Sequence, residues 1–382
     1  MRTTDEVLAH LAASAAASLD QATGLEPSLY WNSDIAAAED QSIFRKDWVC
    51  PGLAADIPNP GDYLTFSIAG DPVFSVRDKS GAIRTYSNVC RHRMMQLLQG
   101  RGHTNRIVCP YHAWTYDLNG ALIGAPHMER STGFDKKTVC LPEIRTEIWN
   151  GWIFITQNPD ARPVGEMLAA LLDVVSRYDM QNYVPMVRED HVWQTNWKLL
   201  AENFMEGYHL PVAHKATVGA WFPVGETRFP AEVFDDFTYQ TFKKTGDAKY
   251  GLAHKANTSL THEWRDQSVM PTVFPTLMYV LAPDHMWYLS LRPKGIGEVH
   301  VRFGVALAPE VHASLDNPDA ALKDLVQFFE HVNAEDRGVV EGIYNGSRSR
   351  HAEPGRLSWL EREIHDFQKY LARRLIAAKG DT

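Results

Sequence analysis

The chain has 382 residues, of which 45% are hydrophobic and 22% are charged. This size and composition are typical of a globular protein with two domains. The formal net charge of −9 argues against nucleic acid or an anionic membrane as a partner. No stretch approaches about eighteen consecutive apolar residues, so a membrane-spanning helix is not expected.

The N-terminal segment MRTTDEVLAHLAASAAASLD does not fit a secretory signal, because Asp5 and Glu6 follow a single Arg2 and serines interrupt the alanines. We therefore expect a cytoplasmic protein. Four cysteines in a chain of this length do not suggest a disulfide scaffold. Cys50 and Cys140 have no cysteine or histidine at ligand spacing, so both are predicted to be buried, reduced thiols.

Residues 61–89, GDYLTFSIAGDPVFSVRDKSGAIRTYSNV, alternate between apolar and polar side chains. Turn signals at Gly70-Asp71 and Ser80-Gly81 divide this run into short segments. Alternation with a period of two is typical of strands that bury one face. The sequence therefore predicts a small all-β domain here.

Two pairs of cysteine and histidine follow within residues 90–112. Cys90 and His92 form a C-x-H pair, and after sixteen intervening residues Cys109 and His112 form a C-x-x-H pair. Three interpretations compete: a structural zinc site with two cysteines and two histidines, a Rieske 2Fe–2S cluster with both sulfurs on one iron and both imidazoles on the other, or four unrelated residues. The last is weak, because two such pairs rarely fall in one short window by chance.

The flanking sequence favours the Rieske interpretation over zinc. In VCPYHAWTYDLNGALIG, Pro110 makes the second loop rigid and Asn119-Gly120 is a strong hairpin signal. No helical pattern is present, whereas common zinc fingers place their histidine pair on a helix. Imidazole ligation raises the reduction potential of such a cluster to about −150 to +300 mV, which suits electron relay. Since over two hundred residues follow, the cluster is expected to feed a second site.

The second constellation lies in residues 195–221, TNWKLLAENFMEGYHLPVAHKATVGAW. His209 and His214 are five residues apart, which places them about 140° apart on a continuous helix. Pro211 predicts that a helix starting near Lys198 ends at about His209, so that a bend can bring both imidazoles to one ion. Two imidazoles and one carboxylate form the non-heme Fe(II) site that leaves positions open for O2.

The best candidate for the carboxylate is Asp336, in residues 319–346. Apolar residues of this segment mark one helical face: Leu322, Leu325, Phe329, Val332, Val339, Val340 and Ile343. Asp336 falls on this face, whereas Glu335 and Arg337 fall off it. A buried carboxylate is costly unless it is paired or bound to a metal. The alternative is a core salt bridge from Asp336 to an arginine.

The rest of the chain predicts strands and helices but no dinucleotide site. Residues 285–309 indicate two alternating strands around 294–297, and helical patterns fill 318–345 and 357–378. The segment GIGEVH at 295–300 lacks the third glycine of a dinucleotide fingerprint and follows no βα unit. Any electrons drawn from NAD(P)H would therefore have to come from a separate reductase.

With both sites identified, the chain resembles the large (α) terminal oxygenase subunit of the Rieske non-heme iron oxygenases. The segments NVCRHRMMQL, CPYHAWTYDLNG, NWKLLAENFMEGYHLPVAH and AEDRGVVEG carry the resemblance. It implies an α+β protein with a helical lead-in at 1–41 packing on the catalytic domain, an all-β Rieske domain at 42–155 and a catalytic domain at 156–382. The catalytic domain would be a helix-grip (START-like) fold, with a curved antiparallel sheet and a long C-terminal helix.

The resemblance also implies two cofactors and their ligands. A Rieske 2Fe–2S cluster would be held by Cys90, His92, Cys109 and His112. One mononuclear Fe(II) would be held by His209, His214 and Asp336.

Glu206 lies three residues before His209 and could be a ligand or an acceptor that orients a histidine. The family usually has an aspartate here, which joins a cluster histidine of a neighbouring subunit to an iron histidine. The longer Glu206 keeps the acceptor chemistry. Such a bridge implies contact with His112 of another chain, and hence a homotrimer with electron transfer between subunits. Asn203 resembles a family asparagine that lies near the iron.

For the substrate, the segment EGYHLPVAH with Glu206 is similar to the choline, betaine and carnitine branch. Aromatic residues after the iron motif could form a cage for a quaternary ammonium group: Trp221, Phe222, Phe237, Tyr239, Tyr250, Trp264, Tyr279, Trp287 and Tyr288. The expected reaction is monooxygenation or N-demethylation with O2. The alternatives are hydroxylation of an aromatic ring, as a mono- or dioxygenase, and a non-enzymatic electron-transfer protein, which the second metal site argues against.

Overall fold

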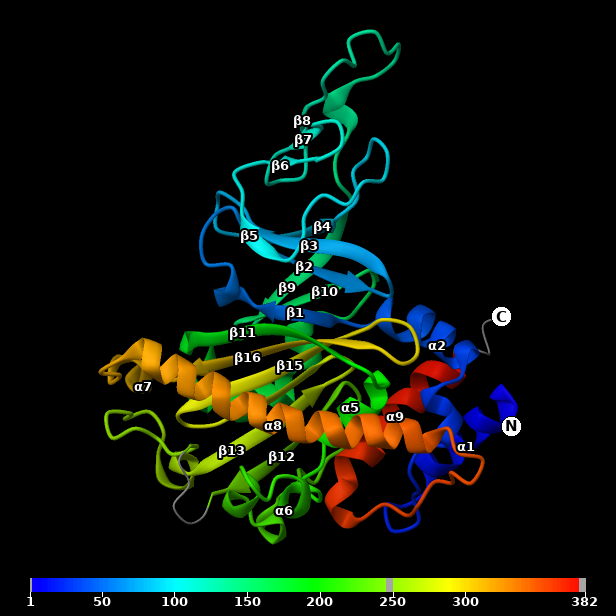
Figure 1. Ribbon diagram of the computed structural model, residues 1–382, viewed down its shortest axis with the longest axis vertical. Helices are drawn as coiled ribbons and strands as arrows, with labels where there is room; N and C mark the ends of the chain where they lie inside the picture. Colours follow the sequence, from blue (N-terminus) through cyan, green and yellow to red (C-terminus); the bar gives the residue numbers. More distant parts are fainter. Residues whose placement is uncertain (1, 245–249, 378–382) are drawn as a thin grey trace. The chain divides into compact units, whose positions relative to one another are not determined.

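The computed structural model describes residues 2–244 and 250–377 (Figure 1). The chain divides into two compact units: one is Phe44–Val164, and the other combines Met1–Ile43 with Gly165–Thr382. The first unit is built mainly of strands and the second of strands and helices, so the expected α+β class is confirmed. None of the described helices is long and apolar enough to cross a membrane.

The unit Phe44–Val164 contains two antiparallel sheets. The larger has the strand order β1 (Val49–Leu53), β10 (Trp152–Thr156), β9 (Glu143–Trp149), β4 (Ile83–Ser87), β3 (Asp71–Arg77), β2 (Asp62–Ile68) and β5 (Arg101–His103). The smaller joins β6 (Ile107–Val108), β7 (Thr115–Tyr116) and β8 (Leu122–Gly124). The turns that flank β3 fall at the predicted turn signals, because Gly70 and Gly81 both have positive φ values there.

The predicted Asn119-Gly120 turn joins β7 to β8. Gly120 has a φ of +81°, and a Cβ atom there would lie 2.8 Å from the ring of Tyr86. Glycine is therefore required both by the backbone conformation and by the close approach. Cys90 and Cys109 belong to the buried core of this part of the unit.

The two remaining cysteines differ from each other. Cys50 is buried in β1, as predicted, but Cys140 is exposed, so that prediction was wrong. Cys140 pairs with Ala121 through an isolated backbone bridge rather than within a strand of either sheet. Nothing in the spacing of the cysteines could show that this segment lies at the surface.

The second unit is built on a six-stranded antiparallel sheet. Its strand order is β11 (Val184–Trp193), β16 (Val299–Leu307), β15 (His285–Pro293), β14 (Leu277–Leu281), β13 (Gln267–Val273) and β12 (Phe237–Lys243). The long helix α8 (Pro318–Ser347) lies across the sheet (Figure 1). This arrangement confirms the expected helix-grip fold. Shorter helices complete the unit: α3 (Val164–Met167), α4 (Ala169–Val175) and α7 (Pro309–Ala313).

Helix α8 begins with a strong start signal and buries one face. The Asn317 side chain accepts a hydrogen bond from the backbone of Ala320, and Pro318 occupies the first turn, where proline is tolerated. The predicted face was correct for its first half, but Ile343 is 46% exposed and Tyr344 is buried instead. The buried stripe therefore moves around the helix towards its C-terminal end, where the indole of Trp31 donates to the carbonyl of Ser347.

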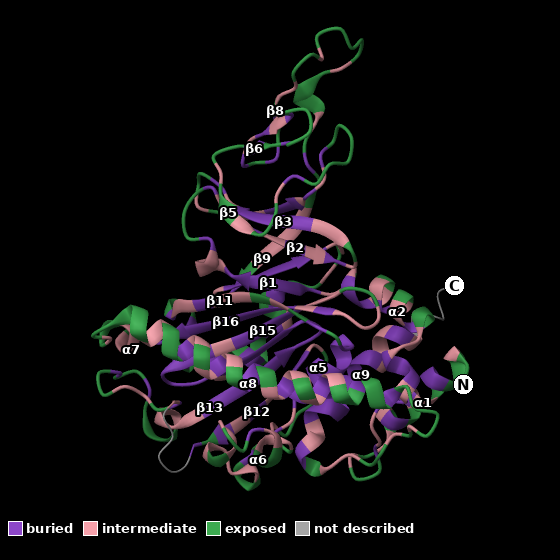
Figure 2. Cartoon of the chain, viewed as in Figure 1, coloured by how far each residue is buried: buried purple, intermediate pink, exposed green. Residues whose placement is uncertain are grey.

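The N-terminal segment packs within the same unit as the catalytic sheet. Helix α1 (Thr4–Ala16) lies against α9 (Arg362–Ala377), and the hydroxyl of Ser14 donates to Gln368 at 3.0 Å. Helix α2 (Ser33–Glu39) ends at Glu39, which is buried. Figure 2 shows that the strands of the sheet are mostly buried, whereas the outer side of α8 is exposed.

Candidate functional site: two metal centres and a pocket

Two short helices and the turn between them position His209 and His214. Helix α5 (Trp197–Phe204) ends at Phe204, so the predicted helix as far as His209 was too long. Met205 closes the helix through its backbone N–H, and the chain then turns before α6 (Leu210–Ala213), which His209 and His214 flank. Pro211 lies in the first turn of α6, so it belongs to the start of a second helix rather than to the end of the first.

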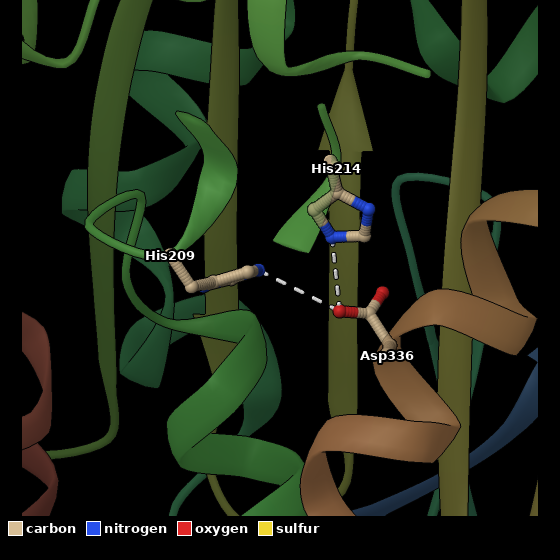
Figure 3. Close-up of side chains that lie close together, drawn as sticks. All are labelled: His209, His214 and Asp336. Atoms are coloured by element: carbon tan, nitrogen blue, oxygen red, sulfur yellow. Dashed lines mark hydrogen bonds and ion pairs between the residues drawn. The ribbon is translucent and has the colours of Figure 1, made fainter. Parts of the chain in front are cut away.

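The two histidines and Asp336 converge on one point (Figure 3). The Oδ1 atom of Asp336 lies 3.0 Å from Nε2 of His214 and 3.5 Å from Nε2 of His209. Asp336 comes from the buried face of α8, whereas both histidines come from the α5–α6 segment. The alternative of an arginine partner was wrong, since Asp336 faces two imidazoles.

A glutamate holds the second ring nitrogen of each histidine. Nδ1 of His209 lies 2.5 Å from Glu206, which also accepts from the backbone N–H of His209 at 3.0 Å. Nδ1 of His214 lies 2.8 Å from Glu335, which the Thr217 hydroxyl also contacts at 2.6 Å. Carboxylates at this position fix the orientation of a metal-binding imidazole and leave Nε2 for the ion. The sequence pointed to Glu206 but placed Glu335 off the buried face.

The electrostatics of this cluster favour a cation. Burial acts to lower the pKa of His209, but the hydrogen bonds to Asp336 and Glu206 outweigh it and raise the pKa to about 10. The pKa of His214 is also raised by Asp336 and Glu335 against the effect of burial. Two imidazoles and a carboxylate within 4.8 Å form a donor set that suits a non-heme iron. A divalent ion would take the place of the protons that these carboxylates attract.

A pocket opens beside the triad, with an empty volume of about 750 Å³ that includes its mouth. His209, His214 and Asp336 line it, as do Asn203 and Glu206. Its walls are otherwise mainly aromatic and aliphatic, and the aromatic side chains are Phe204, Trp221, Phe222, Phe242, Tyr250, Trp287, Phe328 and Phe329. The pocket is therefore an apolar chamber with the candidate metal ligands in its wall.

The sequence identified only part of this wall. Four of the nine predicted cage aromatics line the pocket: Trp221, Phe222, Tyr250 and Trp287. The other five do not: Phe237, Tyr239, Trp264, Tyr279 and Tyr288. Strand alternation explains part of this result. Phe237 and Phe242 are five residues apart on β12, so their side chains point to opposite faces of the strand, and only Phe242 lines the pocket. Lys244 and His285 also line the pocket, and no sequence pattern had marked them.

In the other unit, Cys90 and Cys109 begin two loops of the same geometry. The N–H of the fourth residue after each cysteine donates to the cysteine carbonyl at 3.1 Å: Met94 to Cys90 and Ala113 to Cys109. Both of these residues have positive φ values, of 53° and 56°. The N–H of each cysteine donates at 2.8 Å to a carbonyl five residues later, Cys90 to Met95 and Cys109 to Trp114. The two loops therefore have the same backbone geometry around their cysteine and histidine side chains.

The donors on these loops divide by chemistry and burial. Cys90 and Cys109 are buried, and the hydroxyl of Tyr116 lies 3.4 Å from the Cys90 sulfur. His92 and His112 are exposed, and their ring centroids are 4.7 Å apart. Buried sulfurs and exposed imidazoles fit a 2Fe–2S cluster with two thiolates on its inner iron and two histidines on its outer iron.

Comparison with known proteins identifies the family. Residues 180–377, more than half of the chain, match the ring hydroxylating alpha subunit (catalytic domain). The chain belongs to this family. Residues 47–144 match the Rieske [2Fe-2S] domain. The protein is therefore a Rieske-type oxygenase and an oxidoreductase, with one 2Fe–2S cluster and one mononuclear iron as its cofactors.

The similar proteins of known function include three quaternary ammonium oxygenases. The carnitine monooxygenase oxygenase subunit of Acinetobacter baumannii is 27% identical over 84% of each chain. The glycine betaine monooxygenase oxygenase subunit of Pseudomonas aeruginosa is 34% identical over 57% of this chain and 52% of its own. The chloroplastic choline monooxygenase of Arabidopsis thaliana is 25% identical over 94% of this chain and 84% of its own.

Solved structures share the fold along almost the entire chain. The quaternary ammonium Rieske monooxygenase CntA in complex with L-carnitine has a TM-score of 0.79 at 23% identity, and the match covers 98% of this chain and 99% of CntA. Naphthalene 1,2-dioxygenase from Rhodococcus sp. has the same TM-score at 20% identity, with the same coverage. At these identities the likeness establishes the fold and leaves the substrate open.

Proposed function

We propose that this protein is the terminal oxygenase component that monooxygenates or N-demethylates a small quaternary ammonium compound, using O2 and electrons from a separate NAD(P)H-dependent reductase. The observation that carries the proposal is the aromatic chamber beside the triad. Aromatic faces attract a cation that cannot donate hydrogen bonds, and a desolvated contact of this kind contributes about 2 kcal/mol. The relatives whose names specify carnitine, glycine betaine and choline support the same substrate class.

Each residue has a role in this proposal that follows from its geometry. His209, His214 and Asp336 would hold the iron, and the ligands of the cluster would be Cys90, His92, Cys109 and His112. When bound, the two cofactors supply O2 activation and single electrons. Glu206 and Glu335 keep the Nε2 atoms aimed at one point. The apolar walls exclude water, and the Asn203 side chain provides a polar group beside the triad.

We further propose a homotrimer in which Glu206 passes electrons from His112 of one subunit to His209 of the next. Glu206 already contacts His209, and apolar side chains are exposed next to both centres. Met94 and Tyr111 are 80% and 52% exposed near the cluster loops, and Val212 is 82% exposed in α6. Exposed apolar groups of this kind mark interaction surfaces. Electron transfer between subunits has also been described for CntA. The cytoplasmic location stays a prediction.

Substrate-dependent O2 uptake with a generic reductase and NADH tests the substrate class. We expect coupled uptake with choline, glycine betaine, carnitine or stachydrine, and formaldehyde release would identify N-demethylation. Uptake only with benzoate, salicylate or small phenols would instead assign an aromatic ring hydroxylase that uses the same apolar walls.

Metal analysis separates an oxygenase from an electron carrier. The proposal requires three irons and two sulfides per chain, and His209→Ala should reduce the iron count to two while the sulfide count stays the same. An iron count of two in the anaerobically prepared wild-type protein, unchanged by His209→Ala, would refute the oxygenase assignment.

A further inference from the structure

A buried lysine lines the same pocket. Lys244 directly follows β12, and only 7% of its surface is exposed. Its ammonium group donates to the backbone carbonyl of Tyr250 at 2.5 Å and lies 4.9 Å from the centroid of the Phe222 ring. The ammonium group is thus held by a backbone carbonyl and lies beside one aromatic side chain of the pocket wall.

The backbone is shaped to hold this ammonium group. Gly251 has a φ of +92°, and a Cβ atom there would lie 2.0 Å from Nζ of Lys244. Any other residue at position 251 would displace the ammonium from its place. The glycine is therefore required for the lysine to reach the pocket. The ammonium group has a fixed position, unlike that of a flexible lysine at the surface.

Lys244 has no ion-pair partner among the residues that the structure describes. Among these residues, the charge that acts on it is that of Asp284, whose two oxygens accept hydrogen bonds from other groups. Oδ1 of Asp284 pairs with Nδ1 of His285 at 2.7 Å, and Oδ2 accepts from the N–H of Gly251 at 2.7 Å. The carbonyl of Tyr250 is a neutral acceptor. Burial lowers the pKa of Lys244 to about 8, so the side chain still carries its proton at neutral pH.

A buried, unpaired ammonium is costly unless a ligand supplies the opposite charge. The positive charge of Lys244 would also repel a substrate that carries only a positive charge. A compound with a quaternary ammonium group at one end and a carboxylate at the other would resolve both conflicts, because its anion could pair with Lys244 while its cation lies against the aromatic walls.

We infer that Lys244 binds the carboxylate of the substrate, and that the substrate is a zwitterion which joins a quaternary ammonium group to a carboxylate. The inference rests on the proposed function and narrows it. It separates betaine-type compounds from choline, whose hydroxyl group cannot replace the anion in a charged hydrogen bond.

The test compares matched ligands on the holoenzyme with its reductase. Glycine betaine and γ-butyrobetaine are each paired with their own carboxamide, which keeps the shape and the cation but removes the negative charge. We expect the carboxylates to have a KM roughly 10- to 100-fold lower than the amides, since a hydrogen bond between charged groups has about this effect. Anaerobic calorimetry should show the same preference in binding.

Two substitutions at the site and one control complete the test. Lys244→Met should raise the KM of the carboxylates roughly 10- to 100-fold and leave the amides unaffected, and Lys244→Arg should retain the preference. Lys243→Met is the matched control, because Lys243 is 56% exposed and pairs with Asp266 on the outer side of the same strand end. This control should leave every constant unchanged.

The outcomes separate the inference from the proposed function. The role of Lys244 would be overturned if the wild type had equal KM values for carboxylates and amides, or if Lys244→Met kept the preference for carboxylates. Either result would leave the proposed oxidation of quaternary ammonium compounds standing. Uptake with no quaternary ammonium compound, but with phenols, would overturn the proposed function itself. The wild-type ligand comparison remains decisive if Lys244→Met does not fold.

Discussion

Each imidazole of the triad is held at both of its nitrogens. Asp336 lies at Nε2 of both rings, while Glu206 and Glu335 each take one Nδ1. Three carboxylates thus surround two histidines in a buried place, and their negative charge exceeds what the two imidazoles can balance even when both are protonated. A divalent cation offsets that excess, so the same side chains that orient the ligands also strengthen metal binding.

Glu335→Gln keeps the shape of the side chain and removes its charge. We expect iron affinity to fall about 10- to 100-fold, because a weaker acceptor holds His214 less firmly and makes it a poorer ligand. Anaerobic iron titration of the apoprotein measures this. Asp324→Asn, at an exposed position about three turns earlier on α8, is the control and should bind iron as the wild type does. Equal affinity in both variants would mean that Glu335 only bonds to Thr217.

The charge of Lys244 gives a second prediction at this scale. As pH rises through about 8 the ammonium loses its proton, so kcat/KM for glycine betaine should fall while kcat/KM for its amide does not. Among the described residues, Asp284 is the charged group that acts on Lys244, and Asp284 is itself paired with His285. Lys244→Arg should move the fall to higher pH. A fall of equal size for both ligands would assign it to another group.

The sequence predicted Cys90, His92, Cys109 and His112 as cluster ligands from the spacing of two cysteine–histidine pairs and from their flanking residues. Both kinds of evidence can be read from the sequence without knowledge of the tertiary structure. Glu335 and Lys244 were missed for a different reason: a long polar side chain reaches its partner through tertiary structure, and apolar periodicity only reports which face packs. The turn after Phe204 was also missed, because apolar residues lie on both sides of it and the sequence pattern gives no sign of a break.

At the scale of elements, α5 is unusual because all eight of its residues are buried. Its charged side chains find partners in the N-terminal segment. Nζ of Lys198 bonds Glu39 at 2.5 Å, and the hydroxyl of Tyr30 donates to Glu202 at 2.7 Å. These bonds tie the helix that precedes His209 to residues at the start of the chain. The predicted periodicity found α8 and the strands around 294–297, but it could not show this cross-connection.

Glu202 makes the stability of this element depend on pH. Burial raises its pKa from 4.5 to about 7, although Tyr30 and Lys198 act in the opposite direction. The folded state therefore binds the proton more tightly than the unfolded state, so stability is highest below about pH 4.5 for this group and is lost as pH rises through about 7. The difference between these two pKa values corresponds to a change of ~3 kcal/mol in the free energy of unfolding.

Glu202→Gln should remove that dependence. We expect the wild type to lose more stability than the variant between pH 5 and pH 8, measured as the midpoint of urea unfolding of the holoprotein at each pH. Glu226→Gln is the control, since Glu226 is 57% exposed and its pair with Arg228 contributes little. A variant whose midpoint changes with pH as much as that of the wild type would show that Glu202 keeps its charge in the fold.

At the scale of the whole molecule, one chain carries two centres in two separate units, and each is incomplete as a catalyst. The proposed trimer joins them across subunits, which mixed oligomers can test. Cys109→Ser removes a proposed cluster ligand and Asp336→Ala a proposed iron ligand, so each variant alone should be inactive. Co-expressed and purified as mixed oligomers, they should recover turnover, because an intact cluster on one subunit can serve an intact iron site on the next.

If the two variants assemble at random, the turnover that the mixed oligomers should recover can be calculated. In a cyclic ring each cluster feeds one neighbour, so equal mixtures should reach about one quarter of the wild-type turnover per chain. Separately assembled oligomers, combined afterwards without exchange of subunits, provide the control and should stay inactive. If Glu206 is the bridge, as we propose, placing Glu206→Gln in the Cys109→Ser chain should abolish this recovery while the iron content stays the same. Mixed oligomers that remain inactive with both centres loaded would mean that electrons move within one chain, and that the exposed side chains beside the two centres serve another partner.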